Sequence, residues 1–306
     1  MSSRRSQITR RAWLLAGVAL AVGRAHAASK LRVGLQRSSL LLVLLRQRGV
    51  LAEQVEWAEF PAGPQLLEAL AVGGVDFGMT GDAPPVFAQA AGKELFYVGA
   101  EPPKPHSSAI LVPPDSPLHS LAQLRGRKIA LQKGSSAHYL VARALTKASL
   151  RWRDVTPVYL TPADARAAFQ RGDVDAWAIW DPYYAAAEAA LPTRVLSDGA
   201  SLSGNPAFYL ASPALVKRPQ AVRQLLAALE ECEAWLQAHQ DEAARLYAAQ
   251  SGLALDTVQR MFARRGRVTV RPLDAAMIAE QQRVADTFLE LGLIPSRLKI
   301  AERVGH

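Results

Sequence analysis

The chain has 306 residues, of which 50% are hydrophobic and 21% are charged, and its formal net charge is +9 at pH 7. This length and composition exclude a disordered chain and leave room for one large or two small domains with a buried core. The single cysteine, Cys232, excludes an internal disulfide and a metal cluster built on cysteines.

The first 27 residues have the pattern of an export signal. An arginine-rich start is followed by an apolar run at residues 12–22 and by the small-residue cleavage pattern A-H-A at residues 25–27. The paired arginines in T-R-R-A-W-L-L, at residues 9–15, favour a twin-arginine signal over an ordinary secretory signal. The apolar run is shorter than the ~20 residues that span a bilayer, and no cysteine follows it as a lipid-attachment point. We therefore predict cleavage near Ala27-Ala28 and a mature protein in the periplasm.

The positive charge gives little indication of a nucleic-acid surface. Five arginines and no acidic residue lie in the first 27 residues, so the remaining chain carries a net charge of only +4. Its one basic cluster is Arg264-Arg265-Gly266-Arg267. Nucleic-acid surfaces usually have a larger clustered basic face, so we interpret this cluster as a solvated basic turn and expect no nucleic-acid partner.

Strands and helices alternate through the first part of the mature chain, which predicts an α/β sheet covered on both faces. Proline clusters at residues 102–105 and 113–117 mark a stiff connection around the last of these strands. The expected strands are Leu31–Gln36, Gln54–Phe60, Val75–Met79, Leu95–Ala100 and Ala109–Val112, and the expected helices are Leu40–Arg48, Pro64–Val72 and Pro85–Ala91.

A second α/β run follows, and the chain then becomes mostly helical. A soft boundary at residues 201–206 separates the second run from a further strand at Ala207–Ser212. The second run has expected strands at Arg127–Gln132, Val155–Leu160, Val174–Ile179 and Arg194–Ser197, with helices at Ser136–Ala148, at Ala163–Gln170 and from Pro182. The last part has long amphipathic helices over Ala221–Gln250, Ala254–Phe262 and Asp274–Leu291.

This order predicts two lobes and a chain that returns to the first lobe. Lobe one would contain residues 28–112 and 205–306, and lobe two residues 113–204. The two crossings between them would act as a hinge, with a ligand cleft between the lobes.

Small polar residues follow several predicted strands at the point where a helix begins. Backbone N–H groups and the helix dipole favour an anion there, and ligands of open α/β sheets bind at this edge. The alternative is that these residues are ordinary helix caps, which we favour for Thr161 with Asp164 because their spacing resembles a capping box. The junctions are Gln36-Arg37-Ser38-Ser39, Pro61-Ala62-Gly63, Thr80-Gly81-Asp82, Gln132-Lys133-Gly134-Ser135-Ser136, Thr161-Pro162-Ala163-Asp164 and Trp180-Asp181-Pro182.

No catalytic or cofactor motif accompanies these junctions. The sequence has no G-x-S-x-G, H-E-x-x-H, P-loop or G-x-G-x-x-G pattern, and we expect no catalytic residue, metal or cofactor. His138 could approach Ser135 on a helix, but a histidine on a helix surface is the commoner arrangement. Trp177 and Trp180 would face opposite sides of a strand; Trp180 could line the cleft, although either could equally pack in the core.

Long segments of the chain, in the same order, resemble the periplasmic aliphatic sulfonate-binding proteins of ABC importers, within the nitrate, sulfonate and taurine solute-binding family. They are F-P-A-G-P-Q-L-L-E-A-L, D-F-G-M-T-G-D-A-P-P-V-F-A-Q-A-A-G, V-G-A-E-P-P-K-P, Q-K-G-S-S-A-H and Y-L-T-P-A-D-A-R-A-A-F-Q-R-G-D-V-D-A-W-A-I-W-D-P-Y-Y. The resemblance covers nearly all of the mature chain. It implies a two-lobed type II periplasmic-binding-protein fold and a monomer that captures alkanesulfonates. The ligand would pass to an ABC permease in the inner membrane, with its cytoplasmic ATPase, to supply sulfur.

The same resemblance implies a set of ligand-binding residues around the cleft. A sulfonate is a permanent monoanion with three acceptor oxygens, and N–H and hydroxyl donors can hold it without a buried counter-charge. Asp82 and Asp181 would repel it, so we expect them to orient donors or to meet a ligand amine. The implied residues are Gln36, Gly63, Thr80, Gly81, Asp82, Gly134, Ser135, Ser136, Trp180 and Asp181.

Two other functions stay open at this stage. The first keeps the transport role and changes the ligand to taurine, nitrate, a sulfate ester or a thiamine precursor. The second, an exported enzyme acting on a small anion, is less favoured because the sequence offers no nucleophile–base pair and no metal set.

Overall fold

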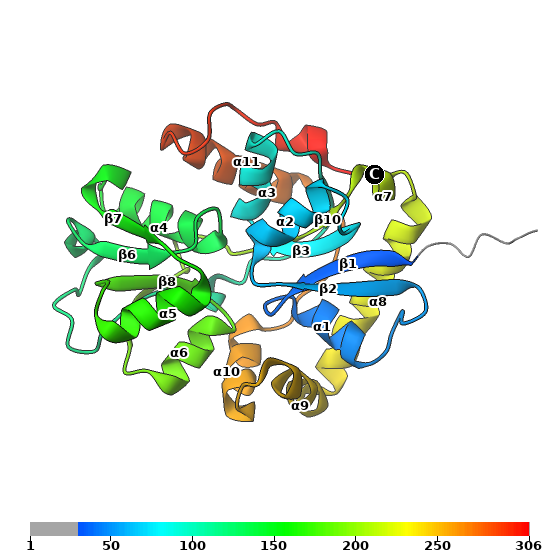
Figure 1. Ribbon diagram of the computed structural model, residues 1–306, viewed down its shortest axis with the longest axis horizontal. Helices are drawn as coiled ribbons and strands as arrows, with labels where there is room; N and C mark the ends of the chain where they lie inside the picture. Colours follow the sequence, from blue (N-terminus) through cyan, green and yellow to red (C-terminus); the bar gives the residue numbers. More distant parts are fainter. Residues whose placement is uncertain (1–29, 306) are drawn as a thin grey trace, which may run out of the picture. The chain divides into compact units, whose positions relative to one another are not determined.

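The computed structural model describes residues 30–305, and their strands form two five-stranded sheets. The predicted signal peptide and its cleavage site lie outside the described residues. Figure 1 shows the strands of the two sheets as separate sets with helices on both faces of each set. This arrangement confirms the α/β class predicted from the alternation of strands and helices.

The first sheet has the order β2-β1-β3-β10-β4. β1 runs parallel to β2 and β3, whereas β10 is antiparallel to β3 and β4. The late strand β10 thus lies between two early strands, so the chain returns to this sheet after building the other one. The strands are β1 (Leu31–Gln36), β2 (Val55–Phe60), β3 (Phe77–Gly81), β4 (Phe96–Glu101) and β10 (Ala207–Ala211).

The second sheet has the order β7-β6-β8-β5-β9. β6 is parallel to β7 and β8, and β5 is antiparallel to β8 and β9. The strands are β5 (Ser108–Val112), β6 (Lys128–Leu131), β7 (Thr156–Tyr159), β8 (Ala176–Trp180) and β9 (Arg194–Asp198). We call each sheet with its covering helices a lobe, the first sheet defining lobe one.

Eleven α-helices cover the sheets within the described residues. The predicted segment Ala221–Gln250 is divided at His239 into α8 and α9. The helices are α1 (Leu40–Gln47), α2 (Gly63–Ala71), α3 (Ala83–Ala90), α4 (Ser136–Lys147), α5 (Pro162–Arg171), α6 (Tyr183–Ala190), α7 (Pro213–Val216), α8 (Pro219–Ala238), α9 (Gln240–Ser251), α10 (Leu255–Arg265) and α11 (Ala275–Glu290).

Strand β5 lies in a different sheet from the one that the sequence predicts. The predicted boundary puts this segment at the end of lobe one, but it pairs with β8 and β9 of the second sheet. Its five residues are all buried, and such a strand fits the interior of either sheet. Proline clusters flank it on both sides, and the first crossing uses the earlier cluster, at residues 102–105, rather than the later one.

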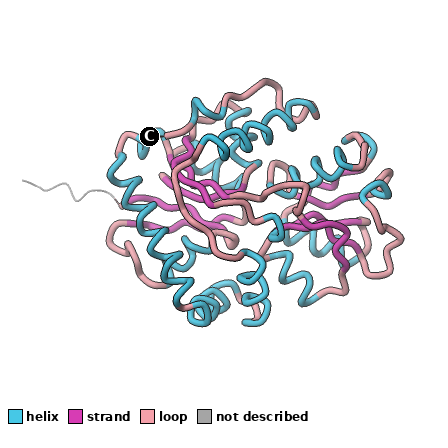
Figure 2. Tube along the Cα trace, turned by 180° about the vertical axis from the view of Figure 1, so that it is seen from behind, coloured by secondary structure: helices cyan, strands magenta, loops and turns pink. Residues whose placement is uncertain are grey.

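The two crossings between the sheets run beside each other. The backbone N–H of Lys104, in the first crossing, donates to the carbonyl of Gly204, in the second, at 2.7 Å. Figure 2, seen from behind, shows loops that run between the two sets of strands. A hinge made of two adjacent connections allows the lobes to rotate about one line.

Helix α1 explains why an almost unbroken run of Leu and Val can form a surface-layer helix. Its residues Leu40–Leu45 are all buried, because one side packs toward β1 and the other is covered by α8 and α9. The C-terminal helices therefore add a second layer outside this face of lobe one.

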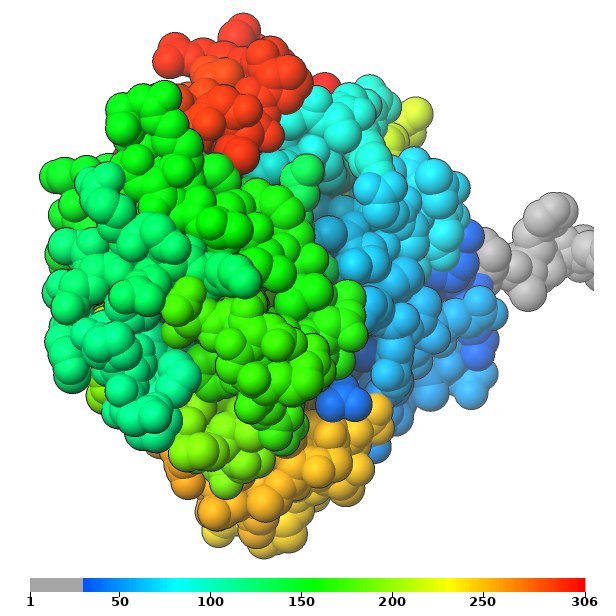
Figure 3. Space-filling model, turned by 60° about the vertical axis from the view of Figure 1, so that its left-hand side comes forward, coloured from blue at the N-terminus to red at the C-terminus, as the bar shows by residue number. Residues whose placement is uncertain are grey.

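Two later helices reach from lobe one to lobe two. Helix α10 packs against α6, and α11 contacts both α3 and α4. In Figure 3 the green surface of lobe two meets the blue surface of lobe one, with α10 in orange at the lower edge and α11 in red at the upper edge. The C-terminal segment thus holds the lobes together on two sides.

An aromatic cluster around His138 fills the contact near α11. Phe87 of α3 and Phe288 of α11 lie 5.5 and 5.2 Å from the His138 ring, measured between ring centroids. Trp152 and Tyr159 of lobe two lie at 4.8 and 5.8 Å. The histidine is fully buried, so the prediction of a histidine on the helix surface is wrong. Contact with a second lobe, which no local pattern reveals, buries it.

The surroundings of His138 keep its ring neutral. Its Nδ1 accepts a hydrogen bond from the backbone N–H of Gly134 at 3.1 Å, which places the ring proton on Nε2. Burial, with a smaller contribution from the nearby Lys133 charge, lowers the pKa of His138 to about 3.

We predict that His138 makes the folded protein less stable in acid. Below pH 6.5 the unfolded chain takes up a proton here, whereas the folded chain does not until the pH approaches 3, so stability falls as the pH falls through this window. From pH 7 to pH 5 this residue should cost about 2 kcal/mol. Urea unfolding at both pH values should show that His138→Phe removes this part of the pH dependence. His119→Phe, at an exposed position, is the matched control. A pH dependence that is identical in His138→Phe and in the unsubstituted chain would contradict the argument.

Candidate functional site

A cavity of about 80 Å³ lies between the lobes at the carboxyl ends of several strands. Residues of β1, β3, β4 and β10 line it from lobe one, and residues near the ends of β6 and β8 line it from lobe two. The lining residues are Gln36, Ser38, Leu40, Gly63, Met79, Gly81, Pro84, Glu101, Lys104, Ser107, Ser135, Ser136, Trp180, Asp181, Asn205, Pro206, Ala207, Tyr247, Met261 and Arg265.

Seven of the ten residues predicted for the site line this cavity: Gln36, Gly63, Gly81, Ser135, Ser136, Trp180 and Asp181. The other three, Thr80, Asp82 and Gly134, are their chain neighbours and lie behind the lining. Sequence reasoning from the strand–helix junctions thus brings together residues of both lobes. Their contact with a ligand stays a prediction.

Three helices begin at the cavity without a side-chain cap. In α1, α2 and α4, the N-cap side chain accepts no hydrogen bond from a backbone N–H of the first turn. At α4, the Ser135 hydroxyl donates to the carbonyl of Gln132 instead, at 2.7 Å. Within the described residues, the backbone N–H groups of Ser136 and Ala137 have no hydrogen-bond partner. These donors and the helix dipole provide a site for an anion.

Gly81 and Ser136 bring the lobes into close contact beside these donors. A Cβ atom on Gly81 would lie 2.0 Å from Ser136 Oγ and 3.3 Å from Ser136 Cβ. A larger residue here would force the Ser136 hydroxyl to rotate away and the two backbones to separate slightly. Two interlobe hydrogen bonds accompany it, from Gln132 Nε2 to Gln65 Oε1 at 3.1 Å and from the Tyr183 hydroxyl to the Pro61 carbonyl at 3.3 Å.

The turn predicted at Thr80-Gly81-Asp82 starts later than expected. Thr80 and Gly81 belong to β3, because the antiparallel neighbour β10 extends the ladder to the Gly81–Ala207 pair. Only Asp82 remains outside the strand, and it caps α3 by accepting from the Ala83 N–H at 2.8 Å.

Asp82 is fully buried behind the cavity and does not face it. Burial raises the pKa of Asp82 to about 6, while the Ser136 hydroxyl and the Ala83 N–H act in the opposite direction. Its Oδ2 has no partner at good hydrogen-bonding geometry among the described residues, so the approach of Ser136 is a weak contact. The observed contacts fit the predicted role of orienting donors better than contact with a ligand amine.

Asp181 faces the cavity and forms an ion pair with Arg264. Arg264 Nη1 lies 3.1 and 3.3 Å from the two carboxylate oxygens, and the Ala185 N–H donates to Oδ1 at 3.0 Å. Arg264 also binds Glu188, and its guanidinium lies 3.8 Å from the centroid of the Tyr184 ring. Burial raises the pKa of Asp181 to about 7, against the attraction of Arg264.

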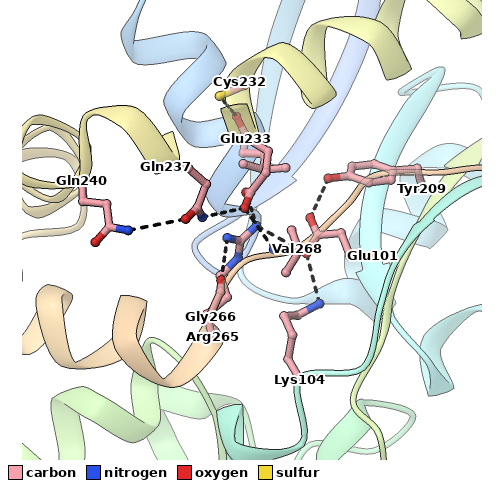
Figure 4. A network of polar contacts seen from close by, with 11 residues as sticks. Glu101, Lys104, Tyr209, Cys232, Glu233, Gln237, Gln240, Arg265, Gly266 and Val268 are labelled. Atoms are coloured by element: carbon pink, nitrogen blue, oxygen red, sulfur yellow. Dashed lines mark hydrogen bonds and ion pairs between the residues drawn. The ribbon is translucent and has the colours of Figure 1, made fainter. Parts of the chain in front are cut away.

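A second charged group beside the cavity is centred on Glu101 (Figure 4). Tyr209 and Lys104 approach the Glu101 carboxylate from opposite sides, with hydrogen bonds of 2.7 and 3.0 Å. Burial alone would raise the pKa of Glu101, but the Lys104 and Arg265 charges and the Tyr209 hydroxyl lower it to about 2. Arg265 is held in turn by Glu233, with Nη2 2.8 Å from Oε2.

The prediction of a solvated basic turn at residues 264–267 is wrong for its first two arginines. The side chains of Arg264 and Arg265 are only 12% and 7% exposed, whereas Arg267 is exposed. Both buried arginines find acidic partners that are distant in the sequence, and a basic run gives no sign of such partners.

Trp177 and Trp180 have different surroundings, as expected for side chains on opposite sides of a strand. Trp177 is buried in the core of lobe two, 5.9 Å from Phe169 between ring centroids. Trp180 lines the cavity and meets the Tyr183 ring edge-to-face at 6.0 Å.

The predicted cap at Thr161 is also present, since its hydroxyl accepts from the Asp164 N–H at 3.3 Å.

Ser135 and His138 do not form a catalytic pair, and no metal set forms among the described residues. His138 Nδ1 bonds to Gly134 and the Ser135 hydroxyl to Gln132, so the two side chains do not form a nucleophile–base pair. The described part of the chain has no group of three potential metal ligands and no helix long and apolar enough to cross a membrane.

Sequence reasoning from single residues missed the charged side of the cavity. Glu101, Lys104, Asn205, Tyr247 and Arg265 all line it, but they follow no strand–helix junction. Glu101 and Lys104 do lie in V-G-A-E-P-P-K-P, one of the segments that carry the family resemblance. A charge pair beside a proline cluster at a strand end was the available signal.

Comparison with known proteins agrees with the fold and the site. The NMT1/THI5 like family matches residues 46–243. An aliphatic sulfonates-binding protein of Escherichia coli (strain K12) is 45% identical over 299 residues, which are 96% of this chain and 94% of that protein.

Two solved structures are similar over almost their whole length. The crystal structure of the periplasmic aliphatic sulphonate binding protein of Escherichia coli has a TM-score of 0.83 and 45% identity, and covers 90% of this chain and 97% of that one. The alkanesulfonate-binding protein of Xanthomonas axonopodis pv. citri, bound to MOPS, has a TM-score of 0.86 and 44% identity with the same coverage. These matches confirm the resemblance and the periplasmic-binding-protein fold predicted from the sequence.

We predict that removing Arg264 destabilises the protein in a pH-dependent way. In Arg264→Met, Asp181 and Glu188 lose their cation, which should cost about 3–5 kcal/mol at pH 8. The cost should be smaller at pH 5, because a buried carboxyl with a raised pKa takes up a proton there. Urea unfolding at the two pH values measures both effects.

Arg267→Met is the matched control, since this arginine is exposed and lies three residues away. It should leave stability within about 0.5 kcal/mol of the unsubstituted chain. Equal effects of the two substitutions would contradict the structural role of Arg264.

Proposed function

The chain belongs to the NMT1/THI5-like family and groups with its aliphatic sulfonate-binding proteins, and from this premise we propose that it is the solute-binding component of an ABC importer for aliphatic sulfonates. The ligand would be captured in the cavity between the lobes and passed to a permease in the inner membrane, where the cytoplasmic ATPase drives import. The imported sulfonate would supply sulfur.

The uncapped start of α4 is the observation that carries this proposal. The free N–H groups of Ser136 and Ala137 provide two donors at one place. A sulfonate has three acceptor oxygens at fixed tetrahedral positions, so it can use these donors together. Its charge is permanent, so binding needs no proton and no buried counter-ion.

The charges around the cavity support a ligand of low net charge. Glu101 is paired with Lys104 and Arg265, and Asp181 shares Arg264 with Glu188. No cation of these groups is left without an acidic partner, which disfavours a ligand that carries a second negative charge. Trp180 and the methionines Met79 and Met261 add apolar surface for the carbon chain.

We infer that the ligand favours the closed arrangement of the lobes. Donors of lobe two and the Gly81 edge of lobe one meet at the same place, so only the closed form offers both to one sulfonate. A ligand that binds the closed form better shifts the population toward it. The permease would then recognise outer surfaces of a closed monomer in the periplasm, the compartment that is stated for the Escherichia coli relative.

Calorimetric titration of the mature chain from Ala28 tests the proposal. Ethanesulfonate and longer alkanesulfonates should bind one-to-one, whereas sulfate and nitrate should give no saturable heat. Binding of taurine or nitrate alone would replace the ligand class while keeping the transport role. Binding of none of these, or turnover of a sulfonate, would overturn the proposal.

We predict that Gly81→Ala weakens sulfonate binding by at least about tenfold. The added methyl group would occupy the space of Ser136 Oγ and press on Ser136 Cβ, so it opposes closure without adding a charge. The thermal midpoint of the ligand-free protein should change little, which separates this effect from misfolding. An affinity equal to that of the unsubstituted chain would show that closure does not need this contact.

A further inference from the structure

We propose, resting on the proposed function, that Lys104 selects sulfonates whose far end carries a neutral oxygen, such as a hydroxyl group, over plain alkanesulfonates of the same size. The cavity would then make specific contacts with both ends of its ligand. The sulfonate end would lie at α4 and Gly81, and the oxygen-bearing end at Lys104.

Sheet register fixes the separation of these two ends. Gly81 in β3 pairs with Ala207 in β10, and Ala207 pairs with Glu101 in β4. Neighbouring strands lie about 4.8 Å apart, so the backbones of Gly81 and Glu101 are about 10 Å apart across the sheet edge. All three residues line the same cavity. A short substituted sulfonate can therefore reach both ends once side chains have filled part of this span.

The side-chain ammonium group of Lys104 has more N–H donors than bonded acceptors. Its ammonium carries three N–H groups, and within the described residues Nζ has one partner, Glu101 Oε2 at 3.0 Å. Its own backbone N–H is bonded to Gly204 in the neighbouring crossing, which fixes the residue in the hinge. Two side-chain N–H groups thus remain for an acceptor in the cavity.

The charges beside Lys104 favour a neutral acceptor over an ion. Lys104 and Arg265 balance Glu101 and Glu233, so the group as a whole has no net charge. A second anion on the ligand would be buried without a counter-charge. A ligand ammonium would meet Lys104 and find both Glu101 oxygens already bonded, to Tyr209 and to Lys104.

Asn205 supplies the complementary partner for a hydroxyl group. It lines the same cavity, from the second crossing, and its side chain makes no hydrogen bond with the other described residues. Its backbone lies in the left-handed region, with φ of 47°, which asparagine tolerates better than most residues. A hydroxyl could accept from Lys104 and donate to the Asn205 amide oxygen, whereas a methyl group in its place would satisfy neither.

Matched ligand pairs test this proposal by titration calorimetry. In each pair a terminal hydroxyl replaces a methyl group: 2-hydroxyethanesulfonate against propanesulfonate, and 3-hydroxypropanesulfonate against butanesulfonate. A hydrogen bond to a charged donor is worth enough that the better-fitting hydroxyl compound should bind at least about tenfold more tightly than its partner. The preference should disappear in Lys104→Met.

Lys104→Met also removes a partner of buried Glu101, so folding must be controlled. The double variant Lys104→Met/Glu101→Gln restores the balance of charge and should show the same loss of preference. Lys128→Met, at an exposed position, should retain it. Thermal unfolding of each variant checks that the fold is intact.

Three results would overturn the proposal. They are equal binding within both ligand pairs, a hydroxyl preference that survives in both Lys104 variants, and tighter binding of 3-aminopropanesulfonate or 1,2-ethanedisulfonate than of the hydroxyl compounds. Methanesulfonate is too short to reach Lys104. Its binding therefore distinguishes a failure of the Lys104 proposal from a failure of the transport proposal. If methanesulfonate and alkanesulfonates bind without a hydroxyl preference, only the role of Lys104 is wrong; if no sulfonate binds, both proposals fail.

Discussion

Two neighbouring arginines at the end of α10 bind carboxylates in different lobes, and the cavity depends on this arrangement. Arg264 binds Asp181 and Glu188 of lobe two, whereas Arg265 lies between Glu101 and Glu233 of lobe one. Buried carboxylates would otherwise be protonated or repel an anion. One helix end therefore joins the lobes: Arg265 helps to balance the Glu101 group, and Arg264 offsets part of the charge of Asp181 and Glu188.

Because the arginines and the lysine beside the cavity are already paired with carboxylates, the proposed ligand would be held mainly by weak, directional donors. The uncapped helix starts contribute partial positive charge and free N–H groups, and the absence of a side chain at Gly81 lets the Ser136 hydroxyl of the other lobe lie against it. None of these groups carries a full charge, so their effect depends on closure and on the exclusion of water. If the lobes close on a ligand as proposed, the chemistry of the site and the movement of the lobes would be coupled through the same few atoms.

The sequence located one half of the site better than the other. Ser135, Ser136 and Gly81 could be found because a strand–helix junction places polar residues at a known edge of a sheet. Arg265 and Lys104 follow no such rule: one ends a C-terminal helix and the other lies in a crossing. Their proximity depends on α10 folding back over the lobes, a contact between segments more than 150 residues apart in the sequence.

By itself, the sequence determined the α/β class, the two runs of strands and helices, and the family, because periodicity and strand–helix junctions are local and recur along the chain. The tertiary structure alone decided which sheet received Ser108–Val112, why His138 is buried, and how the basic run at residues 264–267 is used. A buried strand, an aromatic contact and an ion pair each depend on a partner from a distant segment. Contact with a distant segment produces no periodic pattern in the local sequence, so the sequence does not predict it.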